Sequence, residues 1–449
     1  MAFENIPQFA NNFWTYKPRA DVVQPRRLAR KIVTPECCTS SRSGGVATSN
    51  PPPSAHRTCP SKGRAIEVPH SREKNSGAQV RSSAQFPLLR KTYSIVPLDL
   101  RGRLDVVENE RGHMERSGLP AGATALVTGA TGFTGSHLVR KLHAQGIHVR
   151  AIARPQSRIE QLRDVPVEWV IGQVYDPGTV EKAAANVEYI FHVAAAYREA
   201  KVSRETYRRV HVESTQLLAR AARRNPRLQR FVHISTMGVH GHIEHPPADE
   251  TYPFHPGDDY QVTKAEGELW FREFAMQEGL PYTVLRPCAI YGPGDRRLFK
   301  VFRMAARGIL VILGRGQCLY HLIHVEDLTN VMILAATHPA ALGEVFIVGD
   351  PEPIRLQDMA QIIADYYGRS LRVIRLPVGP CFVAAAVCEA VCKPLGIEPP
   401  LYRRRVAFYT KDRAFNTAKL RTRLGYQYVF STEEGLRQTA RWYREHGWL

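Results

Sequence analysis

ALVTGATGFTG, residues 125–135, contains the pattern from which the architecture of this chain can be predicted. A short apolar run ends at Gly129, two more glycines follow at positions 132 and 135, and an amphipathic helical pattern comes next. Gly129 permits a tight turn, Gly132 lets the backbone approach a ligand closely, and Gly135 lets the helix pack against the strand. The N-terminus of such a helix offers N–H groups and a positive dipole end to phosphate. The stretch therefore predicts a dinucleotide-binding turn.

Strand-like and helix-like segments alternate from residue 123 onward. The apolar runs rich in β-branched residues are 125–129, 148–154, 167–172, 189–195, 230–235 and 282–287, and helical patterns such as 136–146 and 207–224 lie between them. This alternation is typical of parallel strands with crossover helices on both faces. We therefore expect an α/β protein with a doubly wound Rossmann sheet mainly in residues 122–290. A smaller C-terminal α/β substrate domain should occupy mainly residues 291–449.

Residues 1–121 differ in composition from the rest of the chain. Stretches such as 40–56 and 70–85 are rich in Ser, Gly, Pro and charged residues, and such segments bury too little apolar surface to offset their ordering entropy. We expect a disordered basic extension. It is either a tail or targeting segment, or upstream sequence translated from a start site placed too early, in which case Met114 is the natural start. Mass spectrometry of the N-terminus of protein from its native source distinguishes these alternatives.

The net charge of +19 raises the question of a nucleic-acid partner. Roughly half of the excess lies in residues 1–120, and most of the remainder is scattered singly along the chain. We therefore expect no nucleic-acid partner. The eight cysteines lack paired metal-binding spacing, so we expect no metal site. With no secretory signal pattern and no apolar run of about 18 residues, we expect a cytoplasmic protein, with peripheral association at a membrane as the alternative.

The end of the second expected strand indicates which nicotinamide nucleotide binds. An acidic residue at this point would accept hydrogen bonds from the ribose 2′-hydroxyl of NAD. This chain has Arg154 and Arg158 there instead, and guanidinium groups would neutralise a 2′-phosphate through charge-assisted bonds. We predict NADP(H), with NAD(H) as the alternative. Two simply solvated arginines are the other interpretation of the same residues.

Tyr260 and Lys264 are the candidate proton-transfer pair. Residues four apart lie on one face of a helix, so the Lys264 ammonium can lower the pKa of the Tyr260 phenol from about 10. Tyr260 can then donate a proton to a carbonyl oxygen as a hydride arrives, or remove one in the reverse direction. We expect the Thr236 hydroxyl to hold that oxygen, with Ser235 as a weaker candidate. An ordinary surface helix pair is the alternative.

Several motifs in one register resemble the extended short-chain dehydrogenase/reductase family, from about residue 123 to the C-terminus. They are the glycine spacing, Val-Ala-Ala at 193–195, Ser235-Thr236, the Tyr-x-x-x-Lys at 260–264, RPCAIYGPGD at 286–295 and HVEDL at 324–328. The nearest branch is that of sterol and 3β-hydroxysteroid dehydrogenases and dihydroflavonol-reductase-like proteins. The resemblance implies catalytic roles for Tyr260, Lys264 and Thr236. It also implies cofactor contacts at Gly129, Thr131, Gly132, Phe133, Gly135, Arg154, Arg158, Gln173, Ala194, Ala195, Ser235, Lys264, Pro287 and Ile290.

Three positions depart from the pattern of the family. Gln173 stands where many members have an Asp that meets the adenine, and an amide can still donate and accept there. His211 replaces a frequent Asn, and His240 replaces a frequent aromatic residue. We expect both histidines to pack in the core, and a role in tuning activity is the alternative.

The C-terminal part should hold the substrate. Relatives that act on nucleotide sugars often have an arginine shortly before the His-Val-x-Asp motif, whereas residues 316–323 contain none, although Arg296, Arg297 or Arg315 could substitute. The apolar segment 378–396 is too short to span a bilayer. In the resembling branch such a segment covers an apolar substrate or touches a membrane surface, and the basic run 403–405 suits anionic head groups. A buried helix of the small domain explains its hydrophobicity equally well.

These observations favour an NADP(H)-dependent oxidoreductase that interconverts a ketone and a secondary alcohol on a hydrophobic, sterol-like or flavonoid-like substrate. A nucleotide-sugar epimerase or dehydratase is the first alternative, and a non-catalytic NADP(H)-sensing protein is the second. The family resemblance also implies a homodimer formed through the helices that contain residues 207–224 and 260–278.

Overall fold

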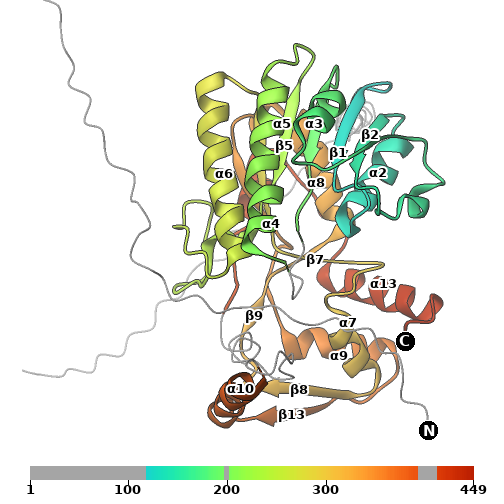
Figure 1. Cartoon of the computed structure of the whole chain (residues 1–449). Helices are drawn as coiled ribbons and strands as arrows, with labels where there is room; N and C mark the ends of the chain where they lie inside the picture. Colours follow the sequence, from blue (N-terminus) through green and yellow to red (C-terminus); the bar gives the residue numbers. More distant parts are fainter. Residues whose placement is uncertain (1–117, 197–201, 393–411) are drawn as a thin grey trace, which may run out of the picture. The chain divides into compact units, whose positions relative to one another are not determined.

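The computed structural model describes residues 118–196, 202–392 and 412–449 (Figure 1). The predicted extension lies outside the described residues except for 118–121. Leu119, within that short piece, is buried in the hydrophobic core. The folded unit therefore includes residues slightly upstream of the predicted boundary at 122.

A seven-stranded parallel sheet forms the centre of the fold, with the order β11-β6-β5-β4-β1-β2-β3. Its strands are β1 (Thr124–Thr128), β2 (His148–Ala153), β3 (Val167–Ile171), β4 (Tyr189–His192), β5 (Arg230–Ile234), β6 (Tyr282–Pro287) and β11 (Val345–Val348). The strand order reverses between β1 and β4, and ligands bind at such a switch point in open α/β sheets. The predicted strands are confirmed. β11 is an additional strand that the sequence analysis did not identify.

Helices cover both faces of the sheet (Figure 1). One face packs against α2 (Phe133–Ala144) and α8 (Val325–Thr337). The other packs against α3 (Pro177–Ala184), α5 (Ser214–Arg223) and α6 (Asp259–Glu278). Side chains of β1 alternate between these layers, since Ala125 and Val127 join the first core cluster and Leu126 joins the second. The doubly wound Rossmann architecture is therefore confirmed.

The helical segment predicted at 207–224 is interrupted. Helix α4 (Arg204–Arg208) runs into a π-helical turn at Arg209–Glu213, and α5 follows directly. A π-turn accommodates one extra residue within a helix and is frequently found at functional sites. The hydrophobic periodicity of the segment did not predict this interruption.

The C-terminal part contains smaller elements around its own core. They are β7 (Ala289–Tyr291), α7 (Phe299–Ala306), β8 (Ile309–Leu313), β9 (Leu319–Tyr320), β10 (Leu322–His324), β12 (Ile354–Arg355), α9 (Leu356–Tyr366), β13 (Arg372–Leu376), α10 (Val378–Cys392), α12 (Ala418–Leu424) and α13 (Thr432–Glu445). Strands pair as β10-β7, β12-β9 and β13-β8. α7, α9 and α13 enclose a separate apolar cluster. Because β11 and α8 belong to the Rossmann layers, the two parts interleave along the chain after residue 290.

Candidate active site

The glycine loop has the geometry that its sequence predicts. Gly129 has a φ of 72°, and a Cβ there would lie 2.9 Å from the backbone nitrogen of Ala194. A Cβ on Gly135 would collide with the carbonyl oxygen of Gly129. Gly132 is exposed, and its N–H donates to that same carbonyl at 3.0 Å. The first and third glycines therefore permit close packing, while the second leaves backbone open to a ligand.

The N-terminus of α2 suits an anionic group. Among the described residues no side chain caps this end, and the first turn contains no acidic residue. The unpaired N–H groups and the dipole of the helix then favour a phosphate. Together with the tight glycine turn, this arrangement fits the pyrophosphate of a dinucleotide.

Arg154 and Arg158 lie in the turn after β2, and both are exposed. The Ser157 hydroxyl accepts a hydrogen bond from the Arg154 N–H at 3.1 Å, which shapes this turn. Gln161 ties the same segment to the glycine loop by donating to the carbonyl of Thr131 at 2.6 Å. The two guanidinium groups are therefore carried by a segment linked to the predicted phosphate-binding loop.

The ends of β1 and β4 are joined across the switch point. The Thr128 hydroxyl accepts a hydrogen bond from the Ala194 N–H at 3.1 Å and lies 2.8 Å from Nδ1 of His192. Burial lowers the pKa of His192 to about 3, and the charge of Lys264 adds to this effect, so the imidazole is neutral. Ala194 is buried and Ala195 is exposed. Ala194, one of the predicted cofactor contacts, thus lies directly beside Gly129, and Ala195 follows it in the chain.

Helix α6 carries the candidate proton-transfer pair. Asp258 caps the helix by accepting a hydrogen bond from the Gln261 N–H at 2.7 Å. Lys264 is buried, and its ammonium donates to the carbonyl of Ile234, at the end of β5, at 2.9 Å. Tyr260 is half-buried. Burial lowers the pKa of Lys264 to about 8, while Glu268 acts in the opposite direction, so the ammonium is still mainly protonated at neutral pH.

The two candidate hydroxyl groups differ in their contacts. Ser235 is buried, and its hydroxyl donates to the Glu268 carboxylate at 2.5 Å. Thr236 is half-buried, and its hydroxyl accepts from the Gly238 N–H at 3.1 Å. A hydroxyl that accepts one bond can still donate another. Thr236 is therefore the better placed of the two to bind a substrate oxygen.

A buried ion pair behind this site was missed by the sequence analysis. Arg286 and Glu268 are both fully buried and are joined at 2.6 Å. Arg286 also donates to the carbonyl of Glu250 at 2.9 Å and lies 3.2 Å from Nε2 of His240. An arginine inside the apolar run YTVLRP, residues 282–287, was the available signal, because a buried guanidinium requires a partner.

The contacts of His240 are those of a residue packed in the core. Burial lowers the pKa of His240 to about 4, and the neighbouring Arg286 contributes, so the ring is neutral. Its Nε2 accepts from Arg286, and its Nδ1 then donates to the carbonyl of Pro253 at 3.3 Å. His240 is thus a packed core residue that links the ion pair to the loop at 250–254.

The remaining predicted contacts lie along the same edge. Gln173 is half-buried in the turn after β3. Pro287 is buried at the end of β6 and pairs with Val348 of β11. Ile290 is half-buried in β7, and its carbonyl accepts from Arg297, whose guanidinium lies 5.6 Å from the ring of Phe133. The structure therefore brings these residues, from both parts of the chain, to the carboxyl side of the sheet.

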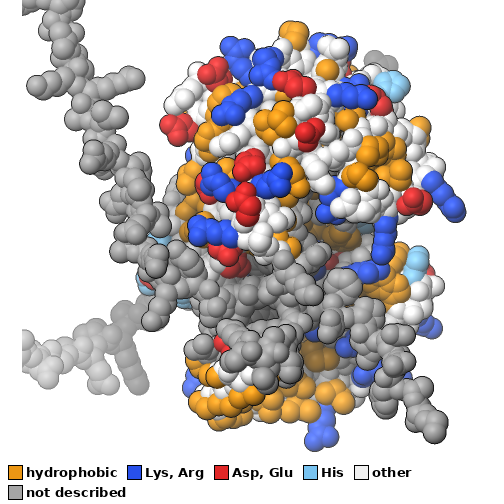
Figure 2. All heavy atoms as spheres, in the orientation of Figure 1, with side chains coloured by type: hydrophobic (Ala, Val, Ile, Leu, Met, Phe, Trp, Pro, Cys, Tyr) orange, Lys and Arg blue, Asp and Glu red, His pale blue; other side chains and the backbone are white. Residues whose placement is uncertain are grey.

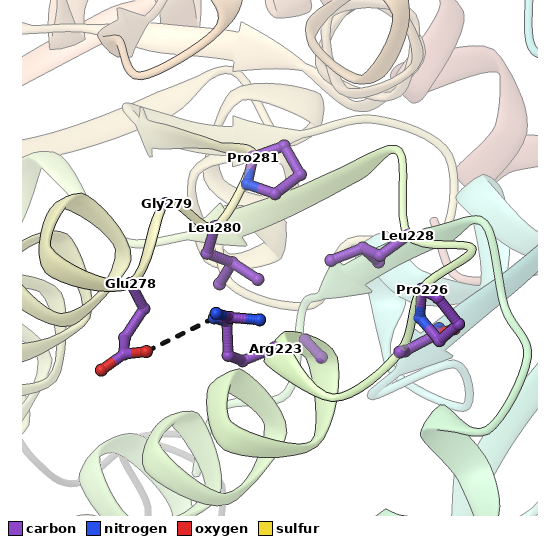
Figure 3. A pocket seen from close by; sticks show the side chains of 9 residues that line it. Arg223, Pro226, Leu228, Glu278, Gly279, Leu280 and Pro281 are labelled. Carbon is purple, nitrogen blue, oxygen red and sulfur yellow. Dashed lines mark ion pairs between the residues drawn. The ribbon is translucent and has the colours of Figure 1, made fainter.

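A surface groove of about 300 Å³ lies elsewhere (Figure 3). It lies between the C-terminal ends of α5 and α6, where Arg223 and Glu278 form an ion pair at 3.3 Å. Leu228 and Pro281, which also line it, precede β5 and β6, so the groove is at the amino edge of the parallel sheet. None of the predicted site residues lines this groove, and we do not assign the cofactor to it.

Comparisons with known proteins agree with this architecture. The chain matches the NAD dependent epimerase/dehydratase family over residues 125–349. It is 30% identical over 336 residues to a 3-beta-hydroxysteroid dehydrogenase of Mycolicibacterium neoaurum, covering 71% of this chain and 91% of that protein. It is 29% identical over 345 residues to 3beta-hydroxysteroid-dehydrogenase/decarboxylase isoform 2 of Arabidopsis thaliana, covering 70% of this chain and 61% of that protein. The chain thus spans about three-fifths of the Arabidopsis relative.

Solved structures show the same fold. Epimerase Mth375 from Methanothermobacter thermautotrophicus is 25% identical, with a TM-score of 0.61, and the match covers 74% of this chain and 96% of that chain. The family match includes the seven-stranded sheet except for Thr124, the first residue of β1. The chain therefore belongs to the NAD dependent epimerase/dehydratase family of enzymes, which confirms the predicted relationship to extended short-chain dehydrogenases and to 3β-hydroxysteroid dehydrogenases.

Proposed function

We propose that this chain is an NADP(H)-dependent oxidoreductase that interconverts a ketone and a secondary alcohol on a hydrophobic substrate. The supporting observation is that α6 carries Tyr260 and Lys264 to the carboxyl edge of the sheet, where the Lys264 ammonium bonds to the end of β5. The glycine loop after β1 lies along the same edge. A pair of proton-transfer residues beside a dinucleotide-binding loop is suited to carbonyl reduction and alcohol oxidation.

The proposed mechanism assigns a separate task to each residue. A bound nicotinamide supplies a hydride in one direction and accepts it in the other. Tyr260 gives its proton to the oxygen of the reduced carbonyl and removes it in the reverse reaction. Thr236 donates a hydrogen bond to that oxygen and so fixes its position. The positive charge of Lys264 stabilises the phenolate that remains when Tyr260 has given up its proton.

Turnover of a substrate panel tests this proposal. Ketones, sterols, aldehydes and nucleotide sugars are offered with NADPH or NADP⁺, and absorbance of the cofactor is followed. We expect Tyr260→Phe to lower the turnover number at least about 100-fold, because general acid–base catalysis contributes this much. Tyr366→Phe, a tyrosine change in α9, serves as the matched control and should retain wild-type turnover. Equal activity of wild type and Tyr260→Phe would exclude the proposed mechanism. NADP(H) binding without turnover of any substrate by either protein would favour a protein that only senses NADP(H).

The preference for NADP(H) is proposed from the two arginines after β2. A 2′-phosphate beside Arg154 and Arg158 gains charge-assisted hydrogen bonds that NAD(H) cannot make. We expect Arg154→Asp to weaken NADPH binding about tenfold or more while leaving NADH binding unchanged or stronger, as measured by nicotinamide fluorescence. Arg441→Asp applies the same charge change to an exposed residue of α13. An unchanged ratio of the two affinities in Arg154→Asp would contradict the assignment.

A nucleotide-sugar epimerase or dehydratase is the competing proposal, because the family name and several solved relatives carry that activity. Such enzymes regenerate the cofactor in place. Nicotinamide that stays bound through purification, without net oxidation or reduction during turnover, would favour this alternative. One NADPH consumed for each ketone reduced would favour the reductase.

A hydrophobic substrate is proposed from the relatives and from α10. Two relatives are named as hydroxysteroid dehydrogenases. In α10 the side chains of Val383, Val387 and Val391 are 63%, 58% and 57% exposed, and Figure 2 shows apolar side chains gathered over this end of the molecule. The predicted basic run 403–405 and residues 393–396 lie outside the described residues.

We propose that the exposed side of α10 contacts a lipid surface or covers an apolar substrate. None of the helices in the described ranges is both long enough and apolar enough to cross a bilayer. Cosedimentation with vesicles of phosphatidylcholine and phosphatidylserine tests the lipid contact. Val387→Asp should reduce the sedimented fraction if this face binds lipid, and an unchanged fraction would contradict it.

A homodimer through α5 and α6 is also proposed. Leu269 and Met276 on α6 are 52% and 64% exposed, and burial of such side chains against a second copy would be favourable. Light scattering after size-exclusion chromatography measures the mass. We expect a dimer for the wild type and a monomer for Leu269→Glu combined with Met276→Glu.

A further inference from the structure

His211 joins two segments that are remote in sequence. It lies in the π-helical turn, and its side chain is buried. The backbone N–H of Ala196, just beyond β4, donates to Nε2 of the imidazole at 3.1 Å. On the other side of the ring, Nδ1 lies 2.8 Å from the hydroxyl of Thr263 in α6. One side chain therefore connects the end of β4 to the helix that carries Tyr260.

These contacts fix the tautomer of the neutral ring. Because Nε2 accepts a hydrogen bond from a backbone N–H, that nitrogen carries no proton. The proton of a neutral imidazole is then on Nδ1, which donates to the Thr263 hydroxyl. Thr263 in turn donates to the carbonyl of Asp259 at 2.7 Å, in the first turn of α6. A directed chain of hydrogen bonds thus runs from Ala196 through His211 and Thr263 to Asp259.

The imidazole also packs against the candidate catalytic ring. The rings of His211 and Tyr260 meet edge to face, with centroids 5.1 Å apart and an interplanar angle of 89°. Tyr207 stacks on the imidazole with centroids 5.6 Å apart. Gly267 allows α6 to come this close, since a Cβ there would lie 2.5 Å from the His211 carbonyl oxygen. The position of the Tyr260 ring is therefore restricted by His211 as well as by its own helix.

We propose that His211 is a positioning residue that holds the Ala194–Ala196 strand end and Tyr260 in one fixed arrangement, a role that rests on the proposed function. The bond through Nε2 fixes the strand end beside Gly129, so its loss should weaken NADP(H) binding. The bond through Nδ1 fixes the first turn of α6, so its loss should slow turnover. The two ring nitrogens therefore have separable effects, which a residue with a purely structural role would not produce.

Three substitutions separate these effects. His211→Phe keeps an aromatic ring and removes both nitrogens. The side chain of His211→Gln reaches the position of Nε2 and can accept from Ala196, whereas the shorter side chain of His211→Asn reaches the position of Nδ1 and can donate to Thr263. The measurements are the dissociation constant of NADPH by fluorescence, and kcat and KM for a ketone that the wild type reduces. Phenylalanine should weaken NADPH binding about tenfold and lower kcat about tenfold or more, with KM nearly unchanged. Glutamine should recover the affinity for NADPH, and asparagine should recover kcat.

His321→Phe is the matched control. His321 is equally buried, its Nδ1 accepts from the Phe415 N–H at 3.1 Å, and its Nε2 lies 2.7 Å from the Asp350 carbonyl oxygen. This variant loses the same kinds of bonds and should keep the wild-type kcat and NADPH affinity. Wild-type values for His211→Phe, or equal losses for His321→Phe, would overturn the proposal.

Changes at Thr263 test the same chain if His211 variants fold poorly. Thr263→Val removes the hydroxyl and should lower kcat about tenfold, whereas Thr263→Ser retains the hydroxyl and should restore it. Equal kcat in both would overturn the proposal. Tyr260→Phe separates the two proposals. Full activity in that variant contradicts the proposed mechanism, whereas its inactivity, together with wild-type kcat and NADPH affinity in His211→Phe, contradicts the positioning role alone.

Discussion

Asp350, in the segment after β11, carries a carboxyl group that burial makes difficult to ionise. One of its oxygens accepts from the Thr432 hydroxyl at 2.8 Å, and the other has no hydrogen-bond partner among the described residues. Burial raises the pKa of Asp350 from 3.8 to about 6, and the charge of Asp327 contributes to the increase. A carboxyl group whose pKa is raised by folding destabilises the folded state when it is ionised.

This destabilisation is present above about pH 6 and is lost as the pH falls from 6 toward 4. We expect Asp350→Asn to raise the free energy of unfolding at pH 8 by about 1–3 kcal/mol and by much less at pH 4.5. Urea denaturation at both pH values measures the difference from wild type. The exposed Asp365, changed in the same way, is the control. A gain of equal size at both pH values would show that ionisation of Asp350 is not its cause.

Gly135 is the residue at which the glycine loop after β1 tolerates least change. A Cβ at this position collides with the Gly129 carbonyl, so Gly135→Ala must displace either α2 or the loop. We expect a loss of about 1–3 kcal/mol in the free energy of unfolding, together with a loss of NADPH binding of about tenfold or more. Gly178→Ala in α3 is the control, because the nearest atom to its Cβ is 3.6 Å away. That change should stabilise the protein by about 0.5–1 kcal/mol and leave NADPH binding intact.

At the scale of elements, Glu326 connects α8 to α2. Its carboxylate oxygens lie 3.1 Å from Nδ1 of His137 and 2.8 Å from the ammonium of Lys141. The hydrogen bond to His137, followed by the interactions with Lys141, holds the pKa of Glu326 at about 2, against an ordinary value of 4.5. The stabilisation is therefore present above about pH 4.5 and lost as the pH falls toward 2.

We expect Glu326→Gln to lower the free energy of unfolding at pH 7 by about 1–2 kcal/mol, a value reduced from the pKa shift because the side chain is partly exposed. Glu433→Gln removes an exposed ion pair with Arg437 within α13 and should change stability by less than about 0.5 kcal/mol. Guanidinium denaturation of both variants measures these changes. If Glu326→Gln lowers stability no more than Glu433→Gln does, then the interactions of Glu326 between α8 and α2 do not stabilise the fold.

At the scale of the whole molecule, the interleaving of the two parts should make unfolding cooperative. β11 and α8 belong to the C-terminal half of the chain but are built into the Rossmann layers, so the sheet cannot lose them without opening its own core. We expect one thermal transition by far-UV circular dichroism and by tryptophan fluorescence. The fluorescence reports on both parts, since Trp169 and Trp270 pack in the Rossmann layers and Trp442 and Trp448 pack in the C-terminal cluster. NADP⁺ at about 100 times its dissociation constant should stabilise the folded state by about 2.7 kcal/mol and raise the midpoint temperature of both transitions together. NAD⁺ at equal concentration should raise these midpoints less. Separate transitions for the two signals would contradict this expectation.

Local patterns in the sequence were sufficient to predict the nucleotide-binding half of the fold. Strand runs such as 125–129 and the spacing of Gly129, Gly132 and Gly135 depend on neighbouring residues alone, and the structure has them as predicted. The pairing of Tyr260 with Lys264 could also be predicted from the sequence, because residues four apart share one face of any helix. These features are encoded by periodicity and by the steric demands of single residues.

Other features were decided only by the tertiary structure. No local sequence feature distinguishes β11 from other short apolar runs. It is a strand of the sheet because it pairs with β6. Glu268 and Arg286 form a buried pair, and His211 bonds to Ala196 and Thr263, only because packing brings these segments together. Partners of this kind are distant in sequence, and their pairing is set by the burial of whole elements. Composition and periodicity therefore do not indicate which residues come into contact.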